Sequence, residues 1–118
     1  MPARLGRALT AELCRQCGMA ELVPTAELVV SELVTNAVEH AAGVGRDGHR
    51  VTLTVSVTRR GVSIEVADPD PHGPAVRAAG PWDEGGRGTF LVAAHSSSWG
   101  WRPRPDGKSV WAELALAS

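Results

Sequence analysis

The chain carries almost no net charge and has no long hydrophobic run, and both absences exclude classes of protein. Its 118 residues include 12 basic and 13 acidic side chains, a net charge of −1 at pH 7. That balance provides no positive surface for nucleic acid or for an anionic membrane. No apolar run approaches the roughly 20 residues of a bilayer-spanning helix, and the N-terminus lacks the apolar core of a signal peptide. We therefore expect a cytoplasmic protein that contacts neither nucleic acid nor membrane directly.

Cysteine is scarce as well. Cys14 and Cys17 form a single C-x-x-C pair, whereas a structural zinc site needs about four ligands. We interpret the two as small thiols packed in or beside a core. The sequence has no internal repeat, and 43% hydrophobic and 21% charged residues are typical of a globular protein. Its length predicts one domain over residues 1–118 with a single core.

Apolar residues recur at helical spacing in two stretches near the N-terminus. The first stretch predicts a helix over residues 3–19. The second predicts a helix over residues 25–42, because Pro24 is expected to stop the preceding segment and Thr25 is a good N-cap. Glycines follow this second helix, as they often do just beyond a helix C-terminus.

The period then changes to two, which indicates strands. Alternating apolar and polar residues predict strands over residues 51–58 and 62–66, joined by a tight hairpin turn. A helix is expected at 89–95, and a second strand pair at 97–102 and 108–116. The order α-α-β-β-loop-α-β-β predicts an α/β (α+β) two-layer sandwich, with helices on one face of a mixed, mostly antiparallel sheet.

Three polar residues of the second predicted helix fall on one face. Glu32, Asn36 and His40 follow one another at i, i+4 and i+8, at the edge of the apolar arc beside Val29. One interpretation is that they are solvated flank residues. The other is that the helix lines a polar cavity next to the core, where an acid, an amide and an imidazole would serve a ligand.

Two further elements carry candidate chemistry. Asp68 lies at a strand end before a proline-rich segment, and Gly86-Arg87-Gly88 precedes the predicted helix that begins near Thr89. Glycines let a backbone approach an anion closely, and a helix N-terminus offers unpaired N–H groups, so this turn is suited to phosphate. The alternatives are a turn-forming aspartate and a flexible loop.

Taken together, these segments resemble a known family. The stretches SELVTNAVEHA, EVADPDP, GGRGTFLVAAHSSSWGW and GKSVWAEL, in this order, are similar to the Bergerat-type (GHKL) ATP-binding domain. More narrowly, they resemble the anti-sigma-factor serine/threonine kinases that act in bacterial partner switching. The resemblance covers most of the chain, from the first helix to Leu114. It implies ATP and Mg²⁺ as ligands.

The resemblance also implies roles for the residues of the first two motifs. Asn36 would ligate Mg²⁺ through its carbonyl oxygen, and Glu32 would activate the attacking hydroxyl in phosphoryl transfer. His40 occupies a position near the ribose or the phosphates. Asp68 would accept a hydrogen bond from the exocyclic amine of adenine.

For the later motifs, the resemblance places Gly86, Arg87, Gly88 and Thr89 in the second glycine box beside the phosphates. Ser109 resembles the late-strand hydroxyl near adenine. The chain departs from the pattern in its first glycine box, where Asp70 and His72 stand at glycine positions. It also lacks the N-terminal strand common in the family, which predicts an open sheet edge or one covered by a partner.

The implied activity is an ATP-dependent serine/threonine kinase acting on an anti-sigma-antagonist (STAS-type) protein. The implied partners further include a sigma factor, and a homodimer is a candidate assembly. The alternative is a binding module that holds nucleotide or partner without catalysis. A sensor histidine kinase fragment is disfavoured, because no histidine precedes the second helix to accept phosphate. We interpret the strand tryptophans 99, 101 and 111 as core or interface residues, and Trp82 as part of a short lid between residues 73 and 85.

Overall fold

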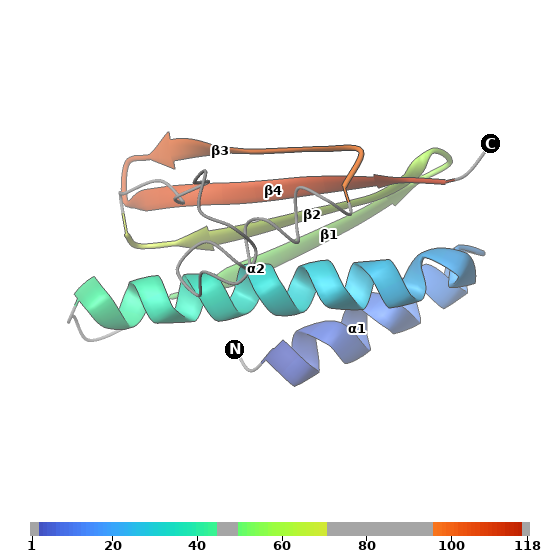
Figure 1. The fold of residues 1–118 in the computed structure, drawn as a ribbon, viewed down its shortest axis with the longest axis horizontal. Coiled ribbons are helices and arrows are strands. Elements are labelled where there is room, and N and C mark those ends of the chain that lie inside the picture. Colours follow the sequence, from blue (N-terminus) through green and yellow to red (C-terminus); the bar gives the residue numbers. More distant parts are fainter. Residues whose placement is uncertain (1–2, 45–49, 71–95, 117–118) are drawn as a thin grey trace, which may run out of the picture.

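The computed structural model describes residues 3–44, 50–70 and 96–116 of the chain. These residues form two α-helices, a short 3₁₀ helix and four strands (Figure 1). The elements are α1 (Ala3–Gln16), η1 (Ala20–Leu22), α2 (Val23–Val44), β1 (Thr52–Thr58), β2 (Gly61–Asp68), β3 (Ser98–Arg104) and β4 (Gly107–Ala115).

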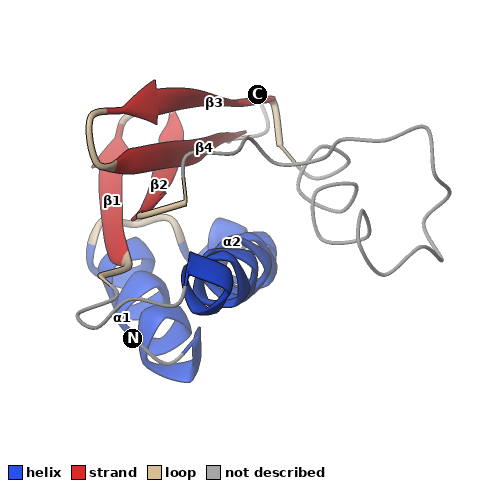
Figure 2. Ribbon diagram, turned by 90° about the vertical axis from the view of Figure 1, so that its left-hand side faces the viewer, coloured by secondary structure: helices blue, strands red, loops and turns tan. Residues whose placement is uncertain are grey.

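The four strands form one sheet in the order β1-β2-β4-β3, and each neighbouring pair is antiparallel. Both helices lie on the same face of the sheet (Figures 1 and 2). Helix α2 packs mainly on β2 and also contacts β4, while α1 packs against α2 and contacts β1. The predicted two-layer α/β sandwich is confirmed, and within the described residues its sheet is antiparallel throughout rather than mixed.

Helix α2 begins earlier than the sequence pattern indicated. It starts at Val23, directly after η1, so Pro24 and Thr25 lie in its first turn. The prediction that Pro24 stops the preceding segment and that Thr25 is the N-cap was therefore wrong. Proline is tolerated in the first turn of a helix, because the N–H that it lacks would have no partner there and its fixed φ suits the helix.

Helix α1 ends at Gln16, before the predicted boundary at residue 19, and the chain reverses direction there. Gly18 adopts a φ of +75°, the left-handed conformation that favours glycine. Its N–H donates to the carbonyl of Arg15 at 3.2 Å, and the N–H of Met19 donates to that of Cys14 at 2.7 Å. This hydrogen-bond pair is a Schellman motif, which satisfies carbonyls at the helix end. Met19 is then buried in the core.

The two cysteines lie in different surroundings, and both thiols are free. Cys14 is fully buried and Cys17 is exposed. Burial, and then the neighbouring Cys17, raises the pKa of the Cys14 thiol above its ordinary value. Cys14 therefore behaves as a small apolar core residue, as the sequence predicted for a thiol of this kind.

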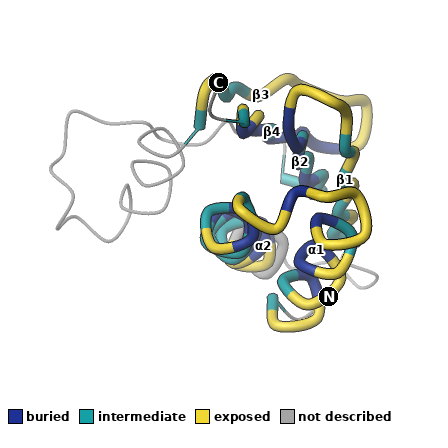
Figure 3. Tube along the Cα trace, turned by 90° about the vertical axis from the view of Figure 1, so that its right-hand side faces the viewer, coloured by how far each residue is buried: buried dark blue, intermediate teal, exposed yellow. Residues whose placement is uncertain are grey.

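The core lies between the helices and the sheet, as the distribution of buried residues shows (Figure 3). Alternation along β2 places every second side chain against the helices. From β3, Trp99 packs against this core, whereas Trp101 is 42% exposed. The most deeply buried apolar residues of α2 and β2 are Ala26, Val29, Val30, Val34, Ile64 and Val66. Among the described residues, no helix is both long and apolar enough to cross a membrane.

Candidate functional site

Helix α2 presents its predicted polar face on the side away from α1. Arg7 of α1 donates to the hydroxyl of Ser31 at 2.9 Å, which marks the flank of α2 that meets α1. At 100° per residue, Asn36 and His40 lie roughly 140° and 180° around the helix axis from Ser31. Because α1 contacts the β1 side of the sheet, this polar flank is directed toward the β4–β3 half.

Glu32 and Asn36 are both half-buried on this flank. Within the described residues, neither side chain has a hydrogen-bond or ion-pair partner. A half-buried carboxylate and a half-buried amide without partners are costly unless a ligand or water satisfies them. This pair therefore has the properties of a ligand-facing surface. His40 follows one turn later in α2, and its backbone lies on the same face.

Asp68 is the last residue of β2 and lies on the same sheet face as Ile64 and Val66, toward the helices. Its side chain is 1% exposed. The N–H of Asp70 donates to Asp68 Oδ1 at 2.8 Å, which closes a turn after the strand. Lys108 Nζ donates to the same oxygen at 3.1 Å. The carboxylate is thus held in one orientation from both sides.

The start of β4 is built for a close approach to Asp68. Gly107 has a φ of +150°, and a Cβ at this position would lie 1.9 Å from the carbonyl oxygen of Asp68. Only glycine leaves room for the two backbones at this distance. The next residue, Lys108, pairs directly with Asp68 in the strand register. Gly107 therefore brings the lysine opposite the aspartate.

The structure does not bring Ser109 to Asp68. Ser109 pairs with Ala67 in the register, one residue away from the pair formed by Asp68 and Lys108. Because successive strand residues point to opposite faces, the buried Ser109 hydroxyl lies on the sheet face away from the helices. The position that faces Asp68 belongs to Lys108 instead.

Lys108 was missed in the sequence, although a signal was present. It falls in phase with the buried residues Val110, Ala112 and Leu114 of β4, so strand alternation places it on the core face. A lysine at such a position requires a partner. Glu32, Asn36 and Asp68 were proposed as site residues because their residue types matched motifs. The predicted residues Gly86, Arg87, Gly88 and Thr89, together with His72 and Trp82, lie outside the described residues.

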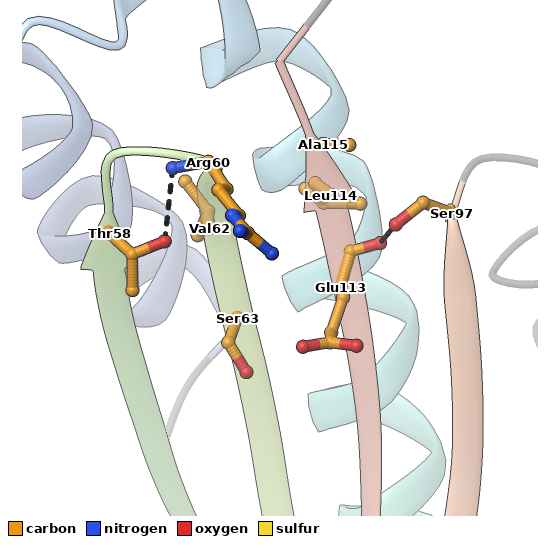
Figure 4. Close-up of a pocket in the computed structure, with 9 residues that line it drawn as sticks. Thr58, Arg60, Val62, Ser63, Ser97, Glu113, Leu114 and Ala115 are labelled. Atoms are coloured by element: carbon orange, nitrogen blue, oxygen red, sulfur yellow. Dashed lines mark hydrogen bonds between the residues drawn. The ribbon is translucent and has the colours of Figure 1, made fainter.

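A hollow of about 310 Å³ adjoins the strand ends at Asp68. Its lining mixes both signs of charge and consists of Arg50, Thr52, Ala67, Asp68, Pro69, Asp106 and Lys108. A second hollow, of about 270 Å³, lies at the opposite end of β2 near the β1–β2 turn (Figure 4). There the Glu113 carboxylate already accepts from Ser98 at 2.7 Å, and its carbonyl accepts from Ser97 at 2.9 Å. The first hollow therefore adjoins Asp68 and Lys108, and none of its described lining residues comes from α2.

The described residues contain no cluster of three or more His, Cys, Asp or Glu side chains that could hold a metal. Mg²⁺ in a nucleotide site does not require such a cluster, because it keeps several waters and takes phosphate oxygens together with one or two protein oxygens. The amide of Asn36, which has no partner in the part of the chain that the structure describes, fits that requirement.

Comparison with known proteins agrees with the fold. The sequence profile of the histidine kinase-like ATPase domain matches residues 3–114, and the chain belongs to that family. It is also similar to an uncharacterised protein of Streptomyces coelicolor, with 33% identity over 89 residues, which cover 73% of this chain and 81% of the relative. The resemblance to GHKL-type ATP-binding domains is thereby confirmed, and membership of the family implies ATP binding.

Proposed function

We propose that this chain is an ATP-binding regulatory protein of the anti-sigma-factor kinase type. It transfers the γ-phosphate of ATP to a serine or threonine of an anti-sigma-antagonist partner of the STAS type, and it sequesters a sigma factor as a second partner. One observation carries the proposal. Glu32 and Asn36 are half-buried, and among the described residues they have no partner, on the flank of α2 that is turned away from α1. Asp68 lies on the side of the β-sheet that faces α2.

In this proposal the binding roles are divided between the two layers. Asn36 offers its carbonyl oxygen to Mg²⁺, which when bound neutralises phosphate charge. Asp68 offers a carboxylate oxygen to the exocyclic amine of adenine. His40 lies one turn beyond Asn36, on the ribose and phosphate side, and Gly86 to Thr89 contribute to phosphate binding.

Glu32 separates binding from catalysis. As a general base, its carboxylate takes the proton of the attacking serine or threonine hydroxyl. The hydroxyl oxygen forms a bond to the γ-phosphorus, the bond from that phosphorus to the β–γ bridging oxygen breaks, and ADP leaves. Glu32 lies one helical turn before Asn36, so the base and the metal ligand share one face.

A second candidate function is a module that binds nucleotide or partner without catalysis. Two observations favour it. Asp70 and His72 stand where the first glycine box has glycines, and Ser109 lies on the sheet face opposite to that of Asp68. Both features depart from the family pattern at the end of the site proposed for the nucleobase, and neither involves Glu32.

The test is phosphate transfer from radiolabelled ATP to purified STAS-type antagonist proteins. Glu32→Gln retains size and polarity but removes the base, so we expect nucleotide binding to persist and labelling to fall by about 10²–10⁴-fold. Glu39→Gln, on an exposed position of the same helix, is the matched control. If wild type binds ATP but labels no antagonist, the binding module is the better description. Equal labelling by wild type and Glu32→Gln would make Glu32 an ordinary flank residue.

A further inference from the structure

Lys108 is the only lysine in the 118-residue sequence, and it is fully buried. Its ammonium group lies at the centre of the turn that follows β2. Nζ is 3.1 Å from Asp68 Oδ1, 3.2 Å from the carbonyl oxygen of Asp70 and 3.8 Å from Asp70 Oδ2. A buried ammonium is retained only where such oxygens compensate its lost hydration. The lysine therefore links the start of β4 to Asp68, the aspartate that we propose contacts the nucleobase.

The contacts of the Asp68 carboxylate are uneven. Both hydrogen bonds that it accepts from the described residues, from Lys108 Nζ and from the N–H of Asp70, end on Oδ1. Oδ2 receives none from the described residues. Since the Asp68 side chain is only 1% exposed and is held at Oδ1, it cannot turn freely to offer both oxygens to a ligand.

We infer that Lys108 is a positioning residue that makes Asp68 a single-oxygen acceptor for the nucleobase. The inference rests on the proposed function, in which Asp68 meets the base. One oxygen without a partner among the described residues suits a single exocyclic amine, such as N6 of adenine. The adjacent N1–H and N2–H of guanine would be read best by two carboxylate oxygens together, and Lys108 withholds one of them. Lys108 thus contributes to the choice of ATP over GTP without touching the base.

The first test uses the wild-type chain. Labelling with ¹⁵N-lysine places a single side-chain Nζ in the protein, because no other lysine is present. A buried, hydrogen-bonded ammonium exchanges slowly, so we expect one Nζ resonance that shifts but persists when ATP is added. If saturating ATP abolishes the resonance through exchange with water, Lys108 leaves Asp68 when the nucleobase binds, and the inference is wrong.

The second test uses Lys108→Arg, which keeps the positive charge. A guanidinium fork pairs with both oxygens of a carboxylate, so it should occupy Oδ2 as well as Oδ1. The probes are ATP, GTP and purine riboside triphosphate, which lacks the 6-amine. We expect wild type to bind ATP about tenfold more tightly than the purine analogue, the value of roughly one hydrogen bond. Lys108→Arg should bring the two affinities together, while the exposed control Arg104→Lys should not.

The outcomes separate this inference from the proposed function. If wild type binds no ATP, both are overturned. If wild type prefers ATP and a folded Lys108→Arg chain keeps the same preference for the 6-amine, only the role of Lys108 is overturned. If Lys108→Arg fails to fold, the Nζ resonance of the wild-type chain decides.

Discussion

At the scale of single residues, the proposed role of the Asn36 amide as a metal ligand leads to a prediction about the affinity for Mg·ATP. Asn36→Ala removes the one oxygen proposed as a metal ligand and leaves the buried arc of α2 untouched. We expect the affinity for Mg·ATP to fall by tenfold or more, about 1.4 kcal/mol. Isothermal titration calorimetry measures it, with the exposed neighbour Thr35→Ala as control. Unchanged affinity in a folded Asn36→Ala chain would remove Asn36 from the site.

Glu65, on the outer face of the sheet, predicts a pH dependence of stability. Partial burial raises the pKa of Glu65, but the hydrogen bond from Arg102 at 3.0 Å and the charges of Arg102 and Arg104 outweigh it and hold the pKa below its usual value. A depressed carboxyl pKa contributes stability above the unfolded-state pKa, and that stability is lost as the pH falls through the folded-state pKa.

We therefore expect Glu65→Gln to lower the free energy of unfolding at neutral pH and to leave it nearly unchanged in strong acid. Urea unfolding across the acid range measures this difference. The effect should be small and should shrink with salt, because the Arg102 side chain is 55% exposed. A Glu65→Gln chain that follows the wild-type pH profile throughout would contradict the assignment.

At the scale of elements, α2 offers a matched pair of valines. Val34 is fully buried against the sheet layer, whereas Val38, four residues later, is 43% exposed. Val34→Ala removes buried methyl groups and leaves a cavity, so we expect a loss of about 2 kcal/mol in the free energy of unfolding. Val38→Ala should cost less than about 0.5 kcal/mol. Denaturant titration compares them, and equal losses would mean that the burial of α2 along its length is assigned incorrectly.

Two glycines allow the cost of an unfavourable backbone conformation to be measured apart from the cost of a steric clash. Both have positive φ, but a Cβ at Gly18 would meet nothing within 4 Å, whereas one at Gly107 would lie 1.9 Å from the carbonyl oxygen of Asp68. Gly18→Ala should therefore cost roughly 1–2 kcal/mol through conformation alone. Gly107→Ala should cost at least about 1 kcal/mol more, because strand β4 must move away from Asp68.

This pair also tests whether the approach of β4 to β2 shapes the site. We expect Gly107→Ala to weaken ATP binding and Gly18→Ala to leave it unchanged, since the end of α1 is remote from Asp68 in the fold. Urea unfolding and calorimetry on the same preparations give both quantities. If the two variants lose equal stability and keep equal affinity, the close approach at Gly107 has no consequence for the site.

At the scale of the whole molecule, the candidate site joins both layers, because Glu32 and Asn36 come from α2 and Asp68 and Lys108 from the sheet. A ligand that binds only the folded chain should then stabilise helices and sheet together. At 100 times the dissociation constant, Mg·ATP should add about 2.7 kcal/mol to the free energy of unfolding. Thermal unfolding followed by circular dichroism should show a single transition at higher temperature. A transition that splits, with only the helices stabilised, would exclude the sheet from the site.

Local patterns predicted most of the fold for a physical reason. In the strand pairs 51–58 with 62–66 and 97–102 with 108–116, alternation and turn residues lie within a few residues of one another in the sequence. Boundaries were less predictable. Whether Pro24 ends one segment or opens a helix depends on the preceding turn, and that turn is set by the packing of α1 against α2.

The sequence alone determined that Glu32 and Asn36, the residues of α2 that we propose face a ligand, share one side of the helix, because helical geometry places them there whatever surrounds them. Tertiary structure decided the other half of the site. Strand register, which depends on how β2 and β4 pair over 40 residues of separation, put Lys108 opposite Asp68 and turned Ser109 to the far face. A shift of one residue in that register would exchange these two side chains, and no local pattern specifies it as strictly as the buried face of the sheet does.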